Sequence, residues 1–154
     1  MVLATAGPAA RAVVLEHFDE RGFCFWTSSE SPTGRQLAEQ PRAALVWLWD
    51  GRQARVEGTV ERVSDDENER HWAGRDGKRQ LAAFRQSEPV ESREELLRLL
   101  DAVTEDEPER PAFWFGYRVV PDRFEFWTVD EDFVHDRFEY AREGDGWRKT
   151  RLQP

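Results

Sequence analysis

The run RFEFWTVDEDFVHDRFEY, residues 123–140, decides how the rest of this chain is interpreted. Its first part alternates in character, since Phe124 and Phe126 fall on one side of an extended strand while Glu125 and Trp127 fall on the other. An antiparallel strand of this kind packs one face on a core and leaves polar groups on the other. The run therefore predicts a half-buried strand, a short loop and a second strand.

The second part of the run crowds charged and aromatic side chains into a few residues. His135 and Arg137 are two positions apart, so on a strand they point the same way, and Trp127 lies one strand earlier. These three groups suit a planar, anionic, ring-containing ligand, because Arg binds phosphate or carboxylate and aromatic rings stack. The alternative is a barrel strand with a surface His and an Asp136–Arg137 pair. Spacing alone leaves both interpretations open.

Length and composition limit the possible classes of protein. The 154 residues suffice for one domain, and 12% aromatic residues, with seven Trp among them, favour a packed core. A net charge of −9 without a basic run disfavours binding to nucleic acid or to an anionic membrane. No apolar run is long enough to span a membrane, and no signal peptide is visible. The single Cys24, expected in the core, fits a reducing compartment, so we predict one cytoplasmic domain over residues 1–154.

Turn residues and hydrophobic periodicity divide the chain into strands with helices inserted between them. Ser31 and Pro32 mark one helix start, and Ser64 with Glu67 gives the capping-box pattern of another. Strands are expected over residues 1–6, 11–17, 23–27, 42–49, 52–63, 112–120, 123–129, 137–142 and 146–151. Helical segments are expected over residues 28–40, 64–73, 80–85 and 91–103, with a basic loop at 75–79. Six or more antiparallel strands with inserted helices predict a closed or split barrel, because closure removes exposed edges.

Three segments of the chain resemble one known family. Phe-Glu-Phe-Trp, a short loop and His-Asp-Arg-Phe-x-Tyr together are similar to the C-terminal motif of the pyridoxine/pyridoxamine 5'-phosphate oxidases, which are FMN enzymes. Residues 111–119 and 147–152 are similar as well. The resemblance implies a mostly β fold with inserted helices, the FMN-binding split β-barrel, with FMN at the interface of a homodimer. Family members usually have a longer N-terminal region with a helix, so we expect a short form or a trimmed start.

The resemblance also implies a set of cofactor-binding residues. By this match FMN is bound by Arg11, Ala12, Val13, Val14, Trp26, Thr27, Gln53, Gln86, Ser87, Trp127 and Arg137. The family's Arg-Lys pair that clamps the FMN phosphate is replaced by Pro32 and Thr33, so two charge-assisted contacts are absent. The helix N-terminus and its hydroxyl groups still attract phosphate. We therefore expect weaker FMN binding than is usual in the family.

The substrate side of the matched site is altered as well. By the same resemblance the substrate contacts are Glu16, His71, Trp72, Arg75, Arg79, Phe133 and His135. Glu16 stands where the family has Lys, and Phe133 stands where it has an Arg over the substrate ring. His135 is retained, and we assign it the catalytic role of orienting the substrate or managing its proton, since an imidazole titrates near neutral pH. Arg75 and Arg79 still offer a positive spot for an acidic substrate, unless they belong to a solvated loop.

These observations support three hypotheses about function. The first is an FMN-dependent oxidase, a homodimer that moves a hydride equivalent from a small ring-containing substrate to FMN and then to oxygen. The lost cations suggest a substrate other than pyridoxamine phosphate, as in the phenazine-biosynthesis branch of the family. The second hypothesis is a non-catalytic split barrel that binds a ligand weakly or serves as a partner subunit, which Pro32 and Thr33 favour. The third is a different cofactor, such as haem or a deazaflavin. His71 and His135 are weak evidence for the ligation of haem iron, and no metal site is expected.

Overall fold

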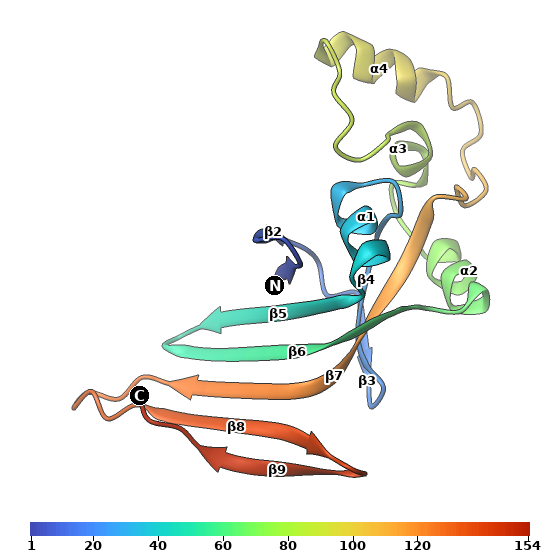
Figure 1. Cartoon of the computed structure of the whole chain (residues 1–154). Helices are drawn as coiled ribbons and strands as arrows, with labels where there is room; N and C mark the ends of the chain where they lie inside the picture. The colour runs from blue at the N-terminus through green and yellow to red at the C-terminus, as the bar shows by residue number, and fades with distance from the viewer.

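The computed structural model describes all 154 residues and is organised around one antiparallel sheet of nine strands (Figure 1). The strands are β1 (Val2–Thr5), β2 (Ala9–Ala12), β3 (His17–Asp19), β4 (Gly22–Ser28), β5 (Arg42–Trp49), β6 (Arg52–Arg62), β7 (Trp114–Thr128), β8 (Asp136–Glu143) and β9 (Gly146–Arg151). Their order is β2-β1-β5-β6-β7-β4-β3, and β8 pairs with β7 and β9. The first half of β7 pairs with β4 and its second half with β8, while β6 runs along its other side. The predicted mostly β fold with six or more antiparallel strands is confirmed.

β7 is a single strand where the sequence predicted two. It continues past Pro121, with a shift in its register to β6 next to Gly58. A Cβ on Gly58 would lie 2.0 Å from the carbonyl oxygen of Val120, so the close approach of the two strands requires glycine. Proline is tolerated here because the ladder is already interrupted by a bulge. The break predicted at residues 121–122 is therefore an irregularity within one long strand.

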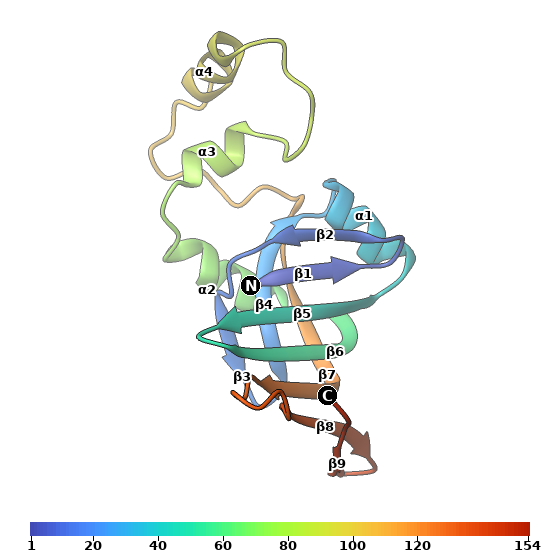
Figure 2. The same ribbon diagram turned by 90° about the vertical axis from the view of Figure 1, so that its left-hand side faces the viewer.

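The strand predicted at residues 11–17 is wrong in its middle. Residues 13–16 belong to neither β2 nor β3, and we call them the crossing segment. β2 pairs with β1 at one edge of the sheet and β3 pairs with β4 at the other, so the chain has to cross between the two edges (Figure 2). Backbone hydrogen bonds hold the crossing segment to Met1 at its start (3.0 and 3.1 Å) and to Cys24 at its end (3.1 Å).

The hydrophobic core is enclosed by the curved sheet. Its large side chains with no exposed surface come from β1, β4, β5 and β7, and they are Leu3, Phe25, Leu45 and Val119. Each such burial stabilises the fold by about 1.5–3 kcal/mol. Cys24 is 1% exposed and burial raises the pKa of its thiol, which agrees with its predicted place in the core.

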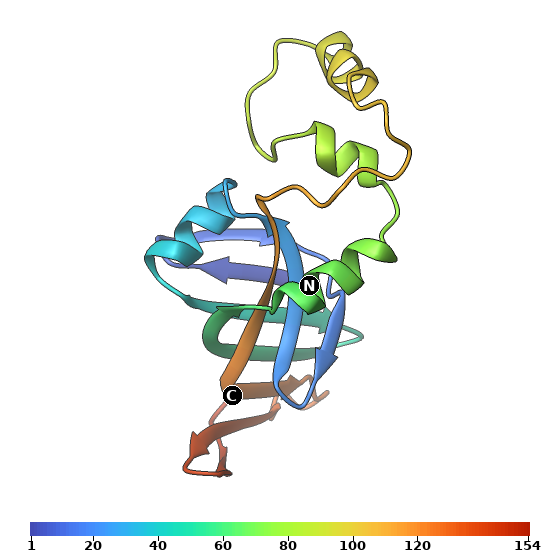
Figure 3. The ribbon, with the colours of Figure 1, turned by 90° about the vertical axis from the view of Figure 1, so that its right-hand side faces the viewer.

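Four helices connect the strands, namely α1 (Pro32–Glu39), α2 (Asp65–Ala73), α3 (Lys78–Ala83) and α4 (Arg93–Asp101). Ser31 caps α1 by accepting the Gly34 N–H (3.1 Å), and Ser64 with Glu67 forms the predicted capping box of α2. The predicted basic loop at 75–79 is partly wrong, because its last two residues begin α3. α1 and α2 lie beside the sheet, whereas α3 and α4 project away from it (Figure 1, Figure 3). None of these helices is long and apolar enough to cross a membrane.

Candidate functional site

A cavity of about 500 Å³ lies where the crossing segment, the end of β4, the start of α1 and the region around α3 meet. Ten residues singled out in the sequence line it, namely Arg11, Ala12, Val13, Val14, Glu16, Trp26, Thr27, Arg75, Gln86 and Ser87. Ser31, Thr33, Leu81 and Trp114 complete the lining. Leu81 and Trp114 were not predicted as site residues, because an apolar residue carries no chemical signal of its own. Trp114 does lie in a segment that resembles the family, and that was the available signal.

Arg11 brings an uncompensated positive charge to this cavity. Its guanidinium donates to the Thr5 hydroxyl (2.7 Å) and to the side-chain oxygen of Gln36 (2.8 Å), and no carboxylate of the chain pairs with it. These neutral partners orient the guanidinium without cancelling its charge. The same cavity receives the start of α1, where Ser31 and Thr33 are 4% and 9% exposed. A guanidinium and a helix N-terminus both attract anions, so this part of the cavity suits a phosphate or carboxylate.

Polar groups that can meet a planar ring also line the cavity. The Gln86 side-chain oxygen accepts the Thr27 hydroxyl (2.8 Å) and the Ser28 N–H (3.0 Å), which holds the loop after α3 against β4. In the crossing segment, the backbone N–H and C=O of Val14 have no hydrogen-bond partner within the chain. Unpartnered peptide groups are strong donors and acceptors. They are therefore available to the heteroatoms of a bound ring.

Trp26 and His71 form a stacked pair beside the cavity. Their ring centroids are 3.7 Å apart and their planes differ by 11°. The indole N–H of Trp26 donates to Oδ1 of the fully buried Asn68 (3.1 Å), which also accepts the Gly116 N–H (2.8 Å). A Cβ on Gly116 would lie 2.5 Å from the Trp26 ring, so this ring position requires glycine there. Burial lowers the pKa of His71, which keeps its imidazole neutral at pH 7.

Glu16 and Arg75 form an ion pair at the cavity wall. Glu16 lies on the crossing segment, and Arg75 lies just after the end of α2. The Arg75 guanidinium donates to the Glu16 carboxylate, and its Nη1 lies 3.4 Å from Nε2 of His71. The three side chains also line a second, polar cavity of about 460 Å³. The structure thus brings together three of the predicted substrate residues.

Two other predicted substrate residues lie outside this group. Arg79 on α3 donates to the carbonyl of Val103 (2.9 Å), just after α4, so the positive spot expected from Arg75 and Arg79 does not form. Trp72 is 5% exposed and its indole donates to the carbonyl of Pro108 (3.0 Å), so it packs inside the protein.

Gln53, Trp127 and Arg137 form a second group on the neighbouring strands β6, β7 and β8. Gln53 is in register with Trp127, and Trp127 with Arg137. The ring of His135 lies 5.0 Å from that of Trp127. His135 precedes β8 in a loop, so the prediction that it shares a strand face with Arg137 is wrong. None of these four residues lines the cavity described above.

The side chains around this second group are held by local contacts. Nε of Arg137 donates to the 3% exposed Glu125 (2.9 Å), while Asp136 pairs with Arg151, so the Asp136–Arg137 pair considered from the sequence is absent. Phe133 is 80% exposed in the loop before β8, with a φ of 62°. Its ring is therefore free to contact another molecule.

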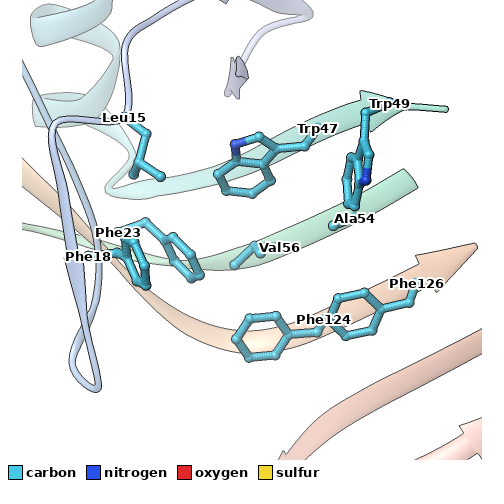
Figure 4. Close-up of a pocket in the computed structure, with 9 residues that line it drawn as sticks. All are labelled: Leu15, Phe18, Phe23, Trp47, Trp49, Ala54, Val56, Phe124 and Phe126. Atoms are coloured by element: carbon cyan, nitrogen blue, oxygen red, sulfur yellow. The ribbon is translucent and has the colours of Figure 1, made fainter. Parts of the chain in front are cut away.

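An apolar groove of about 390 Å³ opens beside β5, β6 and β7 (Figure 4). Nine hydrophobic residues line it, namely Leu15, Phe18, Phe23, Trp47, Trp49, Ala54, Val56, Phe124 and Phe126. Phe124 and Phe126, predicted to share one side of a strand, stack with centroids 6.2 Å apart. Phe18, Trp49 and Phe126 are 65%, 44% and 43% exposed, so a large aromatic surface faces outward. Leu15 joins this groove to the crossing segment.

The chain is thus a mostly β split barrel with a cavity lined by charged, polar and aromatic side chains. The family described as pyridoxamine 5'-phosphate oxidase matches residues 1–105. The family described as pyridoxine 5'-phosphate oxidase C-terminal dimerisation region matches residues 114–154. The chain belongs to the pyridoxine/pyridoxamine 5'-phosphate oxidase family.

Individual relatives and solved structures agree with this assignment. The pyridoxine/pyridoxamine 5'-phosphate oxidase of Rubrobacter xylanophilus is 51% identical over 166 residues, covering 100% of this chain and 76% of that protein. The enzyme of that name from Myxococcus xanthus is 45% identical and covers 100% of this chain and 81% of its own length. PhzG from Burkholderia lata 383, solved with tetrahydrophenazine-1-carboxylic acid, has a TM-score of 0.90 at 33% identity, covering 99% of this chain and 81% of that chain. A pyridoxamine 5'-phosphate oxidase-related, FMN binding protein from Nostoc punctiforme shares the fold, with a TM-score of 0.77 at 20% identity and coverage of 99% and 87%. The predicted family and split β-barrel are confirmed.

Proposed function

We propose that this chain is the subunit of an FMN-dependent oxidase that oxidises a small ring-containing substrate and passes the electrons to oxygen. The observation that carries the proposal is the cavity, where ten residues expected from the family resemblance converge, among them Arg11, whose guanidinium has no carboxylate partner. Its apolar walls suit a ring, and its hydroxyl and peptide groups suit hydrogen bonds to that ring. FMN, when bound, supplies the redox chemistry by accepting a hydride equivalent that oxygen then removes.

The residues of the cavity fit FMN at its ring and in part at its phosphate. Arg11, together with Ser31 and Thr33 at the start of α1, would hold the phosphate, and the unpartnered backbone of Val14 would contact the ring. The family's cationic pair is missing, because Pro32 and Thr33 occupy its positions. We therefore expect a higher Kd for FMN than is usual in the family.

We propose that the functional unit is a homodimer, because the cofactor residues of one chain fall into two groups. Gln53, Trp127 and Arg137 do not line the cavity, so a second copy would supply its own group to complete the site. Residues 114–154 match a dimerisation region, and they contribute two Phe of β7 to the apolar groove. Covering these exposed rings stabilises an assembly through the hydrophobic effect. A monomer mass by light scattering at micromolar concentration would contradict the homodimer.

His135 would orient the substrate and manage its proton. Its Nδ1 accepts the N–H of Asp130 (3.0 Å), so the neutral imidazole carries its proton on Nε2. The edge-to-face contact with Trp127 restrains the ring. A second copy would bring this imidazole to the cavity together with Arg137.

Titration of the FMN-free protein with FMN, followed by flavin fluorescence, tests the cofactor site. A hydrogen bond to a charged group contributes about 1.5–3 kcal/mol, so Arg11→Ala should raise the Kd roughly 10- to 100-fold. Arg42→Ala is a matched control, because Arg42 pairs with Asp122 and does not line the cavity. Equal affinities of the two variants would refute the assignment of Arg11. Absence of FMN binding by the unaltered protein would refute the oxidase proposal.

A non-catalytic split barrel that binds a ligand weakly, or serves as a partner subunit, is the second candidate function. The start of α1 favours it, since Pro32 and Thr33 leave the phosphate with fewer cations than the family provides. A dimeric protein that shows neither FMN binding nor a flavin absorption spectrum would support this candidate.

A further inference from the structure

We propose that Glu16 determines the substrate class of this site: by pairing with Arg75 it makes the pocket select an uncharged ring over the same ring carrying a phosphate. The inference rests on the proposed function, because it assumes that the substrate ring enters this cavity. It gives Glu16 a role in specificity and none in electron transfer.

Arg75 is paired through Nη1 with a carboxylate of its own chain. Its guanidinium donates to the Glu16 carboxylate, and its Nη1 also approaches Nε2 of His71 (3.4 Å). Its charge lies over the ring of Trp114, 5.7 Å from the centroid. The Glu16 and Arg75 side chains are only 20% and 27% exposed. A phosphate that approached this guanidinium would lie beside the Glu16 carboxylate, which repels it and competes with it for the cation.

The other cations around the pair are balanced by carboxylates or directed elsewhere. Arg70, the second cation of the polar cavity, donates through Nε to the carbonyl of Asp66 (3.2 Å). The polar cavity on this side is lined by Arg70 and Arg75 and by Glu16 and Asp76, so its charges cancel. The imidazole of His71 is neutral and adds none. The neighbouring cations Lys78 and Arg79 turn away, the first to Glu107 and the second to the carbonyl of Val103. A phosphate ester carries a charge near −2 at neutral pH, and beside Arg75 it would meet as many carboxylates as cations, while the unpaired Arg11 is assigned to the phosphate of the cofactor.

The ion pair is held in place from both sides. The backbone N–H of Glu16 donates to the carbonyl of Cys24 (3.1 Å), which ties the crossing segment to β4. The backbone N–H of Arg75 donates to the carbonyl of Trp72 (3.1 Å) at the end of α2. His71 stacks on Trp26 and closes the remaining side. If an anion took Arg75 away, the partly buried Glu16 carboxylate would lose its partner, and this costs more free energy than in water. The ion pair therefore resists opening by an anion.

The rest of the wall suits a ring without charge. Val13, Trp26, Leu81 and Trp114 provide apolar and aromatic surface in the same cavity. Such surface binds a ring through burial and stacking, which require no charge on the ligand. The class of substrate selected is therefore a small, uncharged ring without a phosphate group.

Binding of one ring with and without phosphate tests the inference. Pyridoxine and pyridoxine 5'-phosphate are titrated calorimetrically at pH 7.5 into the FMN-loaded protein, for the unaltered chain and for Glu16→Gln. Glu16→Gln keeps the size of the side chain and frees Arg75. It should therefore lower the Kd of the phosphate ester at least tenfold and change the Kd of pyridoxine by no more than about twofold. Glu20→Gln is the control for net charge, because Glu20 is exposed and has no ion-pair partner. The double variant Glu16→Gln with Arg75→Gln should lose the gain.

Each result of these titrations decides the inference. The unaltered protein should bind the phosphate ester no tighter than pyridoxine. Tenfold tighter binding of the ester by the unaltered protein, or no gain in Glu16→Gln, would overturn the proposal. Failure of every variant to bind either ring would overturn it as well. FMN binding, followed in the same samples by flavin fluorescence, reports separately on the proposed function.

Discussion

Replacing Asn68 with alanine should destabilise the fold and disturb the cavity. This side chain has no exposed surface and joins three parts of the molecule. Its Oδ1 accepts the indole N–H of Trp26 (3.1 Å) and the backbone N–H of Gly116 (2.8 Å), and its Nδ2 lies 3.4 Å from the carbonyl of Val63. Alanine cannot accept a hydrogen bond, so two donors on β4 and β7 lose their partner. The Trp26 ring, on which His71 stacks, also loses its anchor.

The size of the effect can be worked out from these contacts. A buried polar group left without a partner costs about 1–3 kcal/mol, so the two shorter bonds of Asn68 give a loss of about 2–6 kcal/mol. Urea denaturation followed by circular dichroism measures it, since the midpoint should fall by about 1–3 M for a typical m-value. Arg70→Ala, at an exposed position of the same helix, is the control, and its free energy of unfolding should stay within about 0.5 kcal/mol of that of the unaltered protein. A loss below about 1 kcal/mol in Asn68→Ala would show that water replaces the amide and would refute the reasoning.

Charge, packing and substrate choice each provide a further test. The pKa of Glu67 is lowered to about 2, chiefly by the hydrogen bond from Arg118, so its stabilising contribution is complete above about pH 4.5 and is lost as the pH falls toward 2. The unfolding free energy of Glu67→Gln should therefore lie below that of the unaltered protein at pH 7, and the gap should close in acid. Gly116→Ala should push the indole of β4 out of place and raise the Kd for FMN, and an unchanged Kd would contradict the packing argument. Glu16→Lys with Phe133→Arg should raise kcat/KM for pyridoxine 5'-phosphate with FMN in excess; a value of roughly 10⁴ M⁻¹s⁻¹ or more in the unaltered protein would contradict this.

The strands could be predicted where periodicity is local, and the errors arose where the course of the chain depends on distant segments. Phe124 and Phe126 share a face as their spacing predicts. Pro121 suggested a strand end, but Gly58 on the neighbouring strand allows the bulge that accommodates it. The crossing segment was predicted as strand because its residues are apolar, yet it joins opposite edges of the sheet. A single stretch of sequence does not show that β2 and β3 lie at opposite edges of the sheet.

The candidate site was predictable through resemblance and not through spacing. His135 and Arg137 are two residues apart, but β8 begins between them and their side chains have different surroundings. Arg79 was expected beside Arg75, yet the start of α3 turns it toward the end of α4. The pairing of Glu16 with Arg75 could not be foreseen either, because it depends on how the crossing segment meets the end of α2. Charges distant in sequence are brought together only by the tertiary fold.

The two arginines of the cavity differ in whether a carboxylate compensates their charge, and this difference indicates how ligands are arranged in the cavity. Arg11 is held by the neutral groups of Thr5 and Gln36 and keeps its charge, whereas Arg75 is neutralised by Glu16. An anionic group gains more from the first guanidinium than from the second, because a carboxylate already lies beside the second. We therefore expect the phosphate of the cofactor near Arg11 and the start of α1, and an uncharged ring near Arg75. One exchange of charge, at residue 16, would then separate this chain from relatives that accept a phosphorylated ring, without any change of fold.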